Sequence, residues 1–556
     1  MPSGAMPQMP VDPSAPVTMP PREASVLSAM LDAQADRIGD APLMLFDDGE
    51  VWSYAQTRAR ARGTAAALAE LGVRRGDRVL VWLPNGRLIF CLHLALSYLG
   101  AVFVPINLAW KGGMLEHVIA NSGARLIICH AELVERLEHV GLADVETLIV
   151  AGGDGVSVPE SLRRLDESVL SSEAEPPALD VEPWEPHGIF YTSGTTGPSK
   201  GVICPHLHTA VMAKVALRFL LPEDRFLISM PYFHLAGALV PFAVIATGAS
   251  MAMLTRFRTS TFWDDVRATG STVCYILDSI RTFLMKQPPR PDDADNPLRV
   301  AVQQPLSHDS VDFARRFGLT IYTQFDMTEI LPVILSEPIG ERGPPGPGYC
   351  GRAVPIWPPC EVRIVDEAER EVPRGATGQL ILRCSLPWVI TPGYWGMPEA
   401  TAAAWRNGWF HTGDVFRQDD EGHFYFVDRM KDSIRRRGEN ISSSEVEAEA
   451  LAHDGIELAA AIAVPSEHSE DEVMLVVKPK PGRTVDYREL FEFLSPRMPH
   501  YMLPRYIRVM EAMEMTATIK VRKDALRRDG VTPDTWDREA AGIVVRGQHI
   551  GGRAPA

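Results

Sequence analysis

The sequence predicts an α/β protein with two large α/β runs, a small β-barrel and a separate α+β domain at its C-terminal end. Three observations lead to this fold class. Apolar segments with helical spacing alternate with short β-branched segments over most of the chain. From Gly343 the texture changes to short strands between Gly/Pro turns, which is typical of a small barrel. A helix-capping pattern near residue 442 then opens a new run.

The composition is that of an ordinary folded protein. The 556 residues are 46% hydrophobic and 23% charged, which excludes a wholly disordered chain. Asp and Glu number 71 against 55 Lys and Arg, so the net charge of −16 argues against a dedicated nucleic-acid binder. No apolar run reaches the ~18 residues of a membrane-spanning helix. We expect a cytoplasmic protein that acts on small molecules, with a homodimer left open.

The cysteines give no sign of a disulfide framework. There are seven, an odd number, and none form a C-x-x-C pair. Such spacing predicts neither a disulfide scaffold nor a zinc site. We therefore expect reduced thiols that serve mainly as small core side chains.

The first α/β run follows a disordered arm. Residues 1–23 are rich in Pro, Met and Ser and are expected to form that arm. An acidic, Pro-rich linker over 172–186 ends the run. Alternation of helices and strands between them favours a parallel or mixed sheet. The expected elements are helices 56–71 and 89–98 and strands 78–83, 125–129 and 147–150.

The second run and the barrel complete a large N-terminal domain, residues 24–428. The second run repeats the pattern of short apolar strands separated by helical segments. Its expected strands are 188–191, 226–230, 251–254, 272–276, 299–302 and 320–325. Those of the barrel are 361–365, 379–383 and 423–427.

The C-terminal domain is expected over 429–530. Residues 442–445 (SSSE) have the pattern of a capping box that opens a helix over 445–452. The expected elements that follow are strands 458–464 and 473–477, helix 487–494 and strand 506–510. The Gly/Arg-rich residues 531–556 are expected to form a flexible tail.

The strongest chemical signal is the segment 191–201 (YTSGTTGPSKG). Its glycines allow a close approach of the backbone to a polyphosphate, its amides and hydroxyls can donate to phosphate oxygens, and its lysine supplies a positive charge. The spacing differs from that of a Walker A loop. Apolar strands on both sides disfavour a plain Ser/Gly linker. The candidate phosphate-binding residues are Thr192, Ser193, Gly194, Thr195, Thr196, Gly197 and Lys200.

A second signal is the segment 324–329 (QFDMTE), which is expected to follow directly after a parallel strand over 319–323. Ligands of α/β sheets bind at the carboxyl ends of such strands. Phe325 can stack on a base, Thr328 can donate to a phosphate, and Glu329 can bind Mg²⁺, which prefers oxygen. Alone, the hexapeptide is equally compatible with a plain strand-to-helix turn.

Three further segments complete the set. Asp414 ends the segment 408–414 (GWFHTGD), where a carboxylate after a glycine turn can accept ribose hydroxyls. Arg429 lies in 428–432 (DRMKD), at the junction of the two domains, and the arginines of 434–440 can either attract an anionic co-substrate or form a solvated charge run. Lys520 lies in a short polar loop near the C-terminal end.

These five segments, in this order, resemble the adenylate-forming superfamily of acyl-CoA synthetases, peptide-synthetase adenylation domains and firefly luciferase. The resemblance covers roughly residues 24–530 and includes 231–234 (PYFH) and 393–401 (GYWGMPEAT). Within the superfamily, the chain is most similar to carnitine/crotonobetaine-CoA-ligase-like members. Three features indicate this: a Met-Thr-Glu without a preceding glycine, the segment 436–442 (RRGENIS) and the segment 535–539 (TWDRE).

The resemblance implies a two-step reaction and a mobile C-terminal domain. A carboxylate attacks the α-phosphorus of ATP to give acyl-AMP and pyrophosphate, and a thiol, usually that of CoA, then takes the acyl group. Catalysis of this kind is mainly positioning and charge stabilisation. In the nucleotide site, the resemblance implies the 192–200 loop for the β- and γ-phosphates, Thr328 for the α-phosphate, Glu329 for Mg²⁺, Phe325 for adenine, and Asp414 and Arg429 for ribose. It implies Lys520 as the catalytic lysine and Lys431 as the hinge of the C-terminal domain. Arg435 and Gly438 would lie on the path of the thiol.

Some residues depart from the family pattern. Gln303 and Gln304 stand where small residues usually let adenine lie on the backbone, so Gln304 is placed at the nucleotide and Gln303 at the acyl pocket. Asp278 and Asp326 also fall near that pocket, and a buried carboxylate requires a cation or a donor. They suggest a substrate with an amine or quaternary ammonium, or else face solvent or backbone amides. His234 is expected at the acyl–pyrophosphate junction or as a structural histidine.

Three other functions stay open at this point. The acyl acceptor can be the thiol of a carrier protein, although no carrier domain is fused to the chain. The activated group can be nitrite, in a diazotisation of an aromatic amine. A non-catalytic adenylate-binding protein is disfavoured because Glu329, Asp414, Arg429 and Lys520 are all present.

Overall fold

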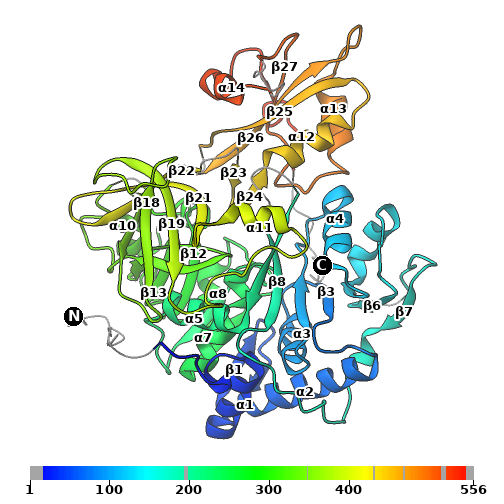
Figure 1. Ribbon diagram of the computed structural model, residues 1–556, viewed down its shortest axis with the longest axis vertical. Helices are drawn as coiled ribbons and strands as arrows, with labels where there is room; N and C mark the ends of the chain where they lie inside the picture. The colour runs from blue at the N-terminus through cyan, green and yellow to red at the C-terminus, as the bar shows by residue number, and fades with distance from the viewer. Residues whose placement is uncertain are drawn as a thin grey trace.

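A computed structural model gives the structure of the chain and describes residues 17–153, 155–192, 198–307, 309–346, 348–429, 433–467, 470–514 and 521–545. A smaller C-terminal unit stands above a larger N-terminal body (Figure 1). Among the described helices, none has the length and apolar character needed to cross a membrane.

The first sheet has seven strands in the order β7-β6-β5-β3-β4-β8-β9. All its neighbours are parallel except β8 and β9. Its strands are β3 (Arg78–Trp82), β4 (Val102–Pro105), β5 (Leu126–His130), β6 (Thr147–Ala151), β7 (Arg163–Asp166), β8 (Pro186–Thr192) and β9 (Lys200–Pro205). The associated helices are α2 (Tyr54–Glu70), α3 (Arg87–Tyr98) and α4 (Gly112–Ser122), with 3-10 segments η2 (Ala131–His139) and η3 (Glu167–Leu170).

The second sheet also has seven strands, in the order β14-β13-β12-β10-β11-β1-β2. Its strands are β1 (Pro42–Phe46), β2 (Val51–Ser53), β10 (Arg225–Ile228), β11 (Ser250–Met253), β12 (Val273–Leu277), β13 (Val300–Gln304) and β14 (Thr320–Tyr322). The other helical segments of the N-terminal body before the third sheet are η1 (Arg22–Ala24), α1 (Leu27–Ile38), α5 (His206–Ala216), α6 (Leu235–Ala238), α7 (Val240–Thr247), α8 (Phe262–Thr269), α9 (Asp278–Met285) and α10 (Ser310–Phe317).

The two sheets exchange their end strands, which the sequence pattern did not indicate. The first α/β run supplies β1 and β2 to the second sheet, and the second run supplies β8 and β9 to the first. The linker at 172–186 therefore does not separate two self-contained sheets. Every residue of α3 from Ile89 to Tyr98 is buried, so this helix belongs to the core of the body.

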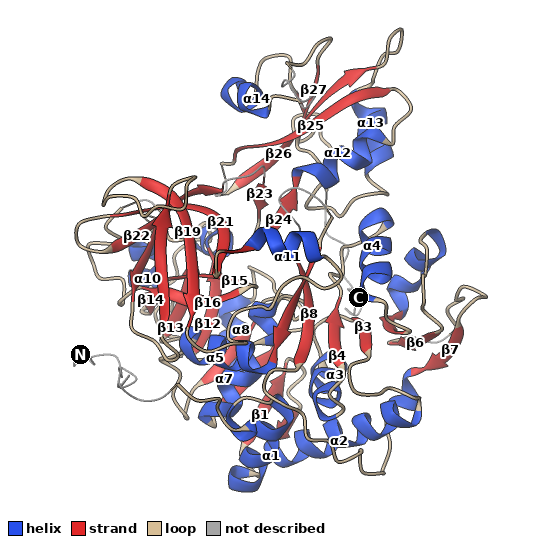
Figure 2. Ribbon diagram, in the orientation of Figure 1, coloured by secondary structure: helices blue, strands red, loops and turns tan. Residues whose placement is uncertain are grey.

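The predicted barrel is an eight-stranded antiparallel sheet with the path β15-β16-β17-β22-β21-β19-β18, to which β20 adds on β21 (Figure 2). The prediction of a single strand over 320–325 is wrong. The strand β14 ends at Tyr322, and Gln324 starts a strand of this third sheet. The elements are β15 (Gln324–Met327), β16 (Ile330–Leu335), β17 (Tyr349–Ala353), β18 (Cys360–Val365), β19 (Thr377–Cys384), α11 (Pro398–Ala404), β20 (Trp405–Arg406), β21 (Trp409–Gln418) and β22 (His423–Arg429).

The C-terminal unit has a two-stranded hairpin and a four-stranded sheet, β25-β26-β27-β28. The start of the predicted flexible tail is part of this sheet, because β28 pairs with β27 and Arg538 is 3% exposed. The elements are β23 (Ser433–Arg436), β24 (Glu439–Ser442), α12 (Ser443–Leu451), β25 (Ile456–Pro465), β26 (Asp471–Pro479), α13 (Tyr487–Leu494), β27 (Tyr506–Val509), α14 (Lys523–Asp529) and β28 (Trp536–Asp537).

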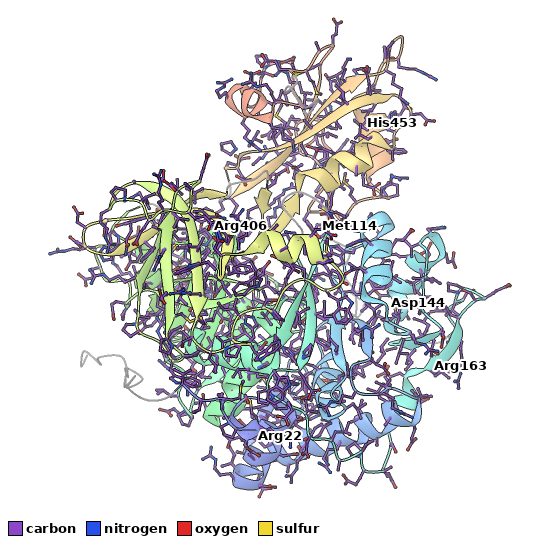
Figure 3. The ribbon with its side chains drawn as sticks, viewed as in Figure 1. Arg22, Met114, Asp144, Arg163, Arg406 and His453 are labelled. Atoms are coloured by element: carbon purple, nitrogen blue, oxygen red, sulfur yellow. A yellow bond between two sulfur atoms is a disulfide. The ribbon has the colours of Figure 1, made fainter. Side chains whose placement is uncertain are left out.

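The two units pack directly against each other. Figure 3 places Met114 at the side of the body that faces the C-terminal unit, which carries His453. Met114 belongs to an apolar cluster that includes Ile434 and Val446 of the C-terminal unit. Polar contacts flank this cluster: the indole N–H of Trp110 donates to the hydroxyl of Tyr501 at 2.9 Å.

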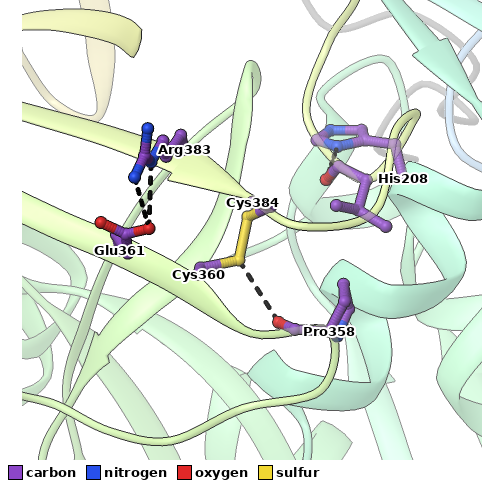
Figure 4. The surroundings of a disulfide bond; sticks show 7 residues. His208, Pro358, Cys360, Glu361, Arg383 and Cys384 are labelled. Carbon is purple, nitrogen blue, oxygen red and sulfur yellow. Dashed lines mark hydrogen bonds and ion pairs between the residues drawn. A yellow bond between two sulfur atoms is a disulfide. The ribbon is translucent and has the colours of Figure 1, made fainter. Parts of the chain in front are cut away.

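One disulfide corrects the expectation that all cysteines are reduced. Cys360 on β18 and Cys384 on β19 are direct partners in the antiparallel register and form a disulfide (Figure 4). Their 24-residue separation gives no local signal, because it is the strand register that brings the two side chains together. Cys91, Cys129, Cys204 and Cys274 are free and buried, and Cys350 is free and half-buried.

Candidate active site

The stem of the phosphate loop is the hairpin of β8 and β9. Thr192 ends β8 and is the register partner of Lys200, which starts β9. The loop is thus held at both ends by one pair of strands. Ser193, Gly194, Thr195, Thr196 and Gly197 lie outside the described residues.

Lys200 and Glu329 approach each other through Tyr394. The ammonium of Lys200 lies 4.8 Å from the centroid of the Tyr394 ring, a cation–π contact. The hydroxyl of Tyr394 donates to Oε1 of Glu329 at 2.9 Å. Glu329 is 6% exposed. Burial and the Glu329 carboxylate raise the pKa of Tyr394, so its hydroxyl stays a donor and orients the carboxylate.

Thr328 and Glu329 form the two-residue turn between β15 and β16, since Met327 pairs with Ile330. The turn is therefore part of a β-hairpin and not a strand-to-helix turn. Nε2 of the buried His208 lies 3.0 Å from the carbonyl oxygen of Thr328, and its Nδ1 lies 2.9 Å from that of Val389. This ring thus fixes the backbone that carries both candidate residues.

The predicted adenine residues lie where β13 meets the third sheet. Nε2 of Gln304, the last residue of β13, donates to the carbonyl of Gln324 at 2.7 Å. Phe325 is half-buried and packs edge-on against Phe416, with 4.7 Å between the ring centroids. The amide and the aromatic ring predicted for adenine thus come from the adjoining ends of the second and third sheets.

The predicted ribose residues lie on neighbouring strands. Asp414 on β21 is 2% exposed and is the register partner of Arg429, the last residue of β22. Its backbone N–H donates to the hydroxyl of Thr412 at 3.1 Å. The side chain of Arg429 lies outside the described part of the structure, so its role as a ribose ligand stays a prediction. Lys431 and Lys520 also lie outside the described residues.

Asp278 has a positive partner within the chain. Its carboxylate accepts from Nε of Arg281 at 2.6 Å and from Nε2 of Gln303 at 2.9 Å. Both charged side chains are 5% exposed. The buried carboxylate therefore does not require a cationic substrate, because Arg281, one turn further along α9, neutralises it.

Asp326 has a different environment. Its Oδ2 accepts from Nε2 of Gln324 at 2.7 Å and from Nε2 of Gln304 at 3.5 Å. Burial raises the pKa of Asp326, against the effect of these amides and of the Arg435 guanidinium. The charge that counters Asp326 thus comes from the C-terminal unit.

The β23–β24 hairpin of the C-terminal unit is seated against Leu277 and His234 of the body, where the acyl pocket is predicted. Its turn residues Arg437 and Gly438 both have positive φ, 53° and 83°. A Cβ added to Gly438 would lie 2.4 Å from Cδ1 of Leu277, so only glycine fits this approach without a shift. Nε of Arg435, on β23, lies 3.3 Å from Oε1 of Glu470.

The same hairpin brings a carboxylate to His234. Oε1 of Glu439 lies 3.2 Å from Nε2 of His234, and the amide of Asn107 lies 3.4 Å from the same oxygen. The His234 charge and hydrogen bond outweigh burial and lower the pKa of Glu439. A cleft of about 830 Å³ runs past these two residues, lined on one side by the body and on the other by residues 437–439.

A second contact joins the C-terminal unit to the predicted phosphate loop. The hydroxyl of Ser199, next to Lys200, donates to Oε1 of Glu445 at 2.9 Å. Glu445, expected to complete a capping box, thus bonds to the loop. Burial raises the pKa of Glu445 to about 7.

Comparison with known proteins follows the same division of the chain. A family model described as "AMP-binding enzyme" matches residues 31–395, and one described as "AMP-binding enzyme C-terminal domain" matches residues 445–520. This chain belongs to the AMP-binding enzyme family. The predicted superfamily and fold class are confirmed.

Within the AMP-binding family, a crotonobetaine/carnitine–CoA ligase of Salmonella agona (strain SL483) is 30% identical over 529 residues, covering 90% of this chain and 98% of the relative. The predicted similarity to such ligases is thereby confirmed.

Two solved structures of o-succinylbenzoate CoA synthetase from Bacillus subtilis are each 21% identical and cover 90% of this chain. A double mutant bound with its product analogue covers 98% of that chain with a TM-score of 0.77. The complex with AMP covers 97% with a TM-score of 0.62. Both structures share the fold of this chain.

Several site residues were missed in the sequence. Tyr394 lies inside a motif that was noted, but its role depends on a contact with Glu329, 65 positions away. Arg281 was detectable in principle, because it stands three positions after Asp278 on a helix. Ser199, Glu439 and Glu445 were not detectable, since they become site residues only through the packing of the two units.

Proposed function

We propose that this AMP-binding enzyme is an ATP-dependent acid–CoA ligase. It activates a carboxylic acid as acyl-AMP with release of pyrophosphate and then transfers the acyl group to the thiol of CoA, with release of AMP. The observation that carries the thiol-transfer step is the β23–β24 hairpin, which lines a cleft of about 830 Å³ and places Glu439 3.2 Å from His234. A thiol that enters this cleft would reach the acyl side of the site.

In the first step the chain positions charge and supplies no nucleophile. Lys200 and the 192–200 loop would hold the β- and γ-phosphates, and Asp414 the ribose. Glu329, oriented by Tyr394, would be the protein ligand of Mg²⁺, which neutralises phosphate charge when bound. Among the described residues no three His, Cys, Asp or Glu side chains converge on a metal site. A single carboxylate with phosphate and water oxygens fits the way Mg²⁺ is commonly bound.

The described arrangement fits the second step. Gly438 and Glu439 lie at the acyl side, and Glu445 bonds to Ser199 in the phosphate loop. Glu445 occupies the hydroxyl of Ser199 in the loop that would hold the β- and γ-phosphates, so we infer that this docking belongs to the state after pyrophosphate has left. We infer that Lys520 acts in the other arrangement and that the C-terminal unit turns near Lys431.

We further propose that the acid carries an amine or quaternary ammonium that faces Asp326. Asp278 is already neutralised by Arg281, whereas the hydrogen bonds that Asp326 accepts from the described residues come from amides, and Arg435 counters it at a distance. When the C-terminal unit turns, Arg435 would leave, and a substrate cation can take its place. Carnitine and crotonobetaine, named for the similar Salmonella ligase, are acids of this class.

A release assay for pyrophosphate tests both proposals. Purified protein, ATP and Mg²⁺ are supplied with fatty, aryl, amino-aryl and betaine acids, each with and without CoA. We expect turnover with CoA to be fastest for a betaine or amino acid. Turnover only with nitrite and an aryl amine, or only with a carrier protein, would contradict the ligase assignment.

Asp326→Asn tests the substrate class separately. We expect it to lower kcat/KM for the cationic acid at least tenfold more than for a neutral acid of the same length, since charge-assisted contacts contribute about 1.5–3 kcal/mol. An unchanged ratio would reject the role of Asp326 and leave the ligase reaction in place.

A further inference from the structure

The turn between β15 and β16, which carries Thr328 and Glu329, is held by a segment that follows β19. This segment covers residues 389–395 and is called the strap below. It lies against β9, because the N–H of Ile203 donates to the carbonyl of Gly393 at 3.1 Å. The strap therefore joins the turn to the strand that leaves the predicted phosphate loop.

The strap holds Glu329 at two points. The N–H of Thr391 donates to the carbonyl of Glu329 at 2.9 Å, and the hydroxyl of Tyr394 donates to its carboxylate at the same distance. Thr391 is itself fixed, since it is 0% exposed and its hydroxyl donates to the carbonyl of Ile203 at 2.8 Å. Both the backbone and the side chain of Glu329 thus take their position from the strap.

His208 holds Thr328 from the opposite side. This residue of α5 is 0% exposed, with Nε2 3.0 Å from the carbonyl oxygen of Thr328 and Nδ1 2.9 Å from that of Val389, the first residue of the strap. The thiol of Cys204 lies 3.9 Å from the same Thr328 oxygen, and a thiol is only a weak donor. One imidazole ring therefore bridges the turn and the strap.

The bridge keeps its shape in either tautomer of the ring. Burial lowers the pKa of His208, so the imidazole is neutral at pH 7 and carries one N–H. It donates to one of the two carbonyls and contacts the other. Because the ring is rigid, the spacing between the Thr328 and Val389 carbonyls stays the same in both tautomers.

We propose that His208 is a positioning residue for acyl-AMP formation, which acts through the backbone of Thr328 and Glu329. The proposal rests on the proposed function, in which these two residues act on the α-phosphate and on Mg²⁺. Displacement of such groups by a fraction of an ångström slows a step that depends on charge stabilisation at phosphate. Acyl transfer takes place after pyrophosphate has left, so it should depend on the bridge much less.

The test measures the two half-reactions separately in the full-length protein. Pyrophosphate release from ATP, Mg²⁺ and acid without CoA gives the first rate, and transfer from supplied acyl-AMP to CoA gives the second. His208→Leu keeps a buried side chain but removes both ring nitrogens. We expect it to lower kcat of acyl-AMP formation about tenfold with little change in the KM for the acid, and to slow transfer less than about twofold.

Two further variants separate positioning from packing. His208→Gln restores a polar N–H group at this site and is expected to bring acyl-AMP formation back to within about threefold of the wild type. His206→Leu removes another buried imidazole from α5, whose Nδ1 accepts from the N–H of Leu27 at 3.4 Å. It should keep the wild-type ratio of the two rates, because partial unfolding lowers both equally.

A third variant serves if His208→Leu does not fold. Thr391→Val is nearly isosteric and removes only the hydroxyl that ties the strap to Ile203. We expect it to slow acyl-AMP formation about threefold and to leave transfer unchanged.

Equal loss of both rates in His208→Leu, or His208→Gln as slow as His208→Leu, would overturn the positioning role and leave the ligase in place. If His208→Leu does not fold, unchanged acyl-AMP formation in Thr391→Val would overturn it. Acyl-AMP formed by the wild type without transfer to CoA would instead overturn the ligase assignment alone, since the rates of acyl-AMP formation in the variants still decide the role of His208.

Discussion

Glu445 makes docking of the C-terminal unit dependent on pH. Its carboxyl accepts from Ser199 beside the phosphate loop, and burial raises its pKa from 4.5 to about 7. An acid with a raised pKa holds its proton more tightly when docked than when exposed. Docking is therefore favoured while the carboxyl is protonated, and it weakens as the pH rises from 4.5 through 7.

The size of this effect follows from the two pKa values. Between pH 6 and pH 8 the docked arrangement loses about 1.4 kcal/mol relative to the undocked one, a change of roughly tenfold in the docking equilibrium. Glu445→Gln keeps an oxygen for the Ser199 hydroxyl and removes the titration. We therefore expect the rate of the variant, relative to the wild type, to rise about tenfold from pH 6 to pH 8.

The assay is transfer from supplied acyl-AMP to CoA, in a single turnover below saturation. Ionisation of the CoA thiol affects both proteins equally, so it cancels in their ratio. Glu492→Gln removes a carboxylate from an exposed position on α13 and should give a flat ratio. Parallel pH profiles for Glu445→Gln and the wild type would refute the reasoning.

Three other substitutions test acyl-AMP formation, the stability of the fold and acyl transfer one at a time. Lys520→Ala should abolish acyl-AMP formation while transfer from supplied acyl-AMP largely persists; equal loss of both rates would show that Lys520 is misassigned. Asp278→Asn leaves Arg281 buried without its carboxylate and should lower the free energy of unfolding by about 3–5 kcal/mol in urea titrations; no change would mean that the pair is not buried in solution. Gly438→Ala, at φ 83° and against Leu277, should slow transfer about tenfold more than acyl-AMP formation; equal rates for variant and wild type would contradict the close approach.

Much of the fold was readable from local pattern. Helix 56–71 corresponds to α2 (Tyr54–Glu70), where Ser53 and Gln56 form a capping box. Strand 78–83 corresponds to β3 and helix 89–98 to α3, because apolar spacing and turn residues define such elements locally. Exchange of strands between the two sheets was not readable, since strand order depends on packing across more than a hundred residues.

The candidate site divides in the same way. Thr328 and Glu329 were expected after a parallel strand, but they form the turn of a β-hairpin. The Asp278–Arg281 spacing of three is compatible with an ion pair on a helix, but its burial depends on the packing of α9, which the local sequence does not encode. The role of Glu439 depends on how the C-terminal unit docks, which no local pattern encodes.

The central claim is that the acid is activated through its carboxylate on the α-phosphate of ATP. The most direct measurement uses an acid labelled with ¹⁸O in its carboxylate, with ATP, Mg²⁺ and CoA, and locates the label by mass spectrometry. We predict one ¹⁸O in the AMP released for each thioester formed and none in pyrophosphate. Label in phosphate with ADP as product, or no label in any nucleotide product, would contradict it.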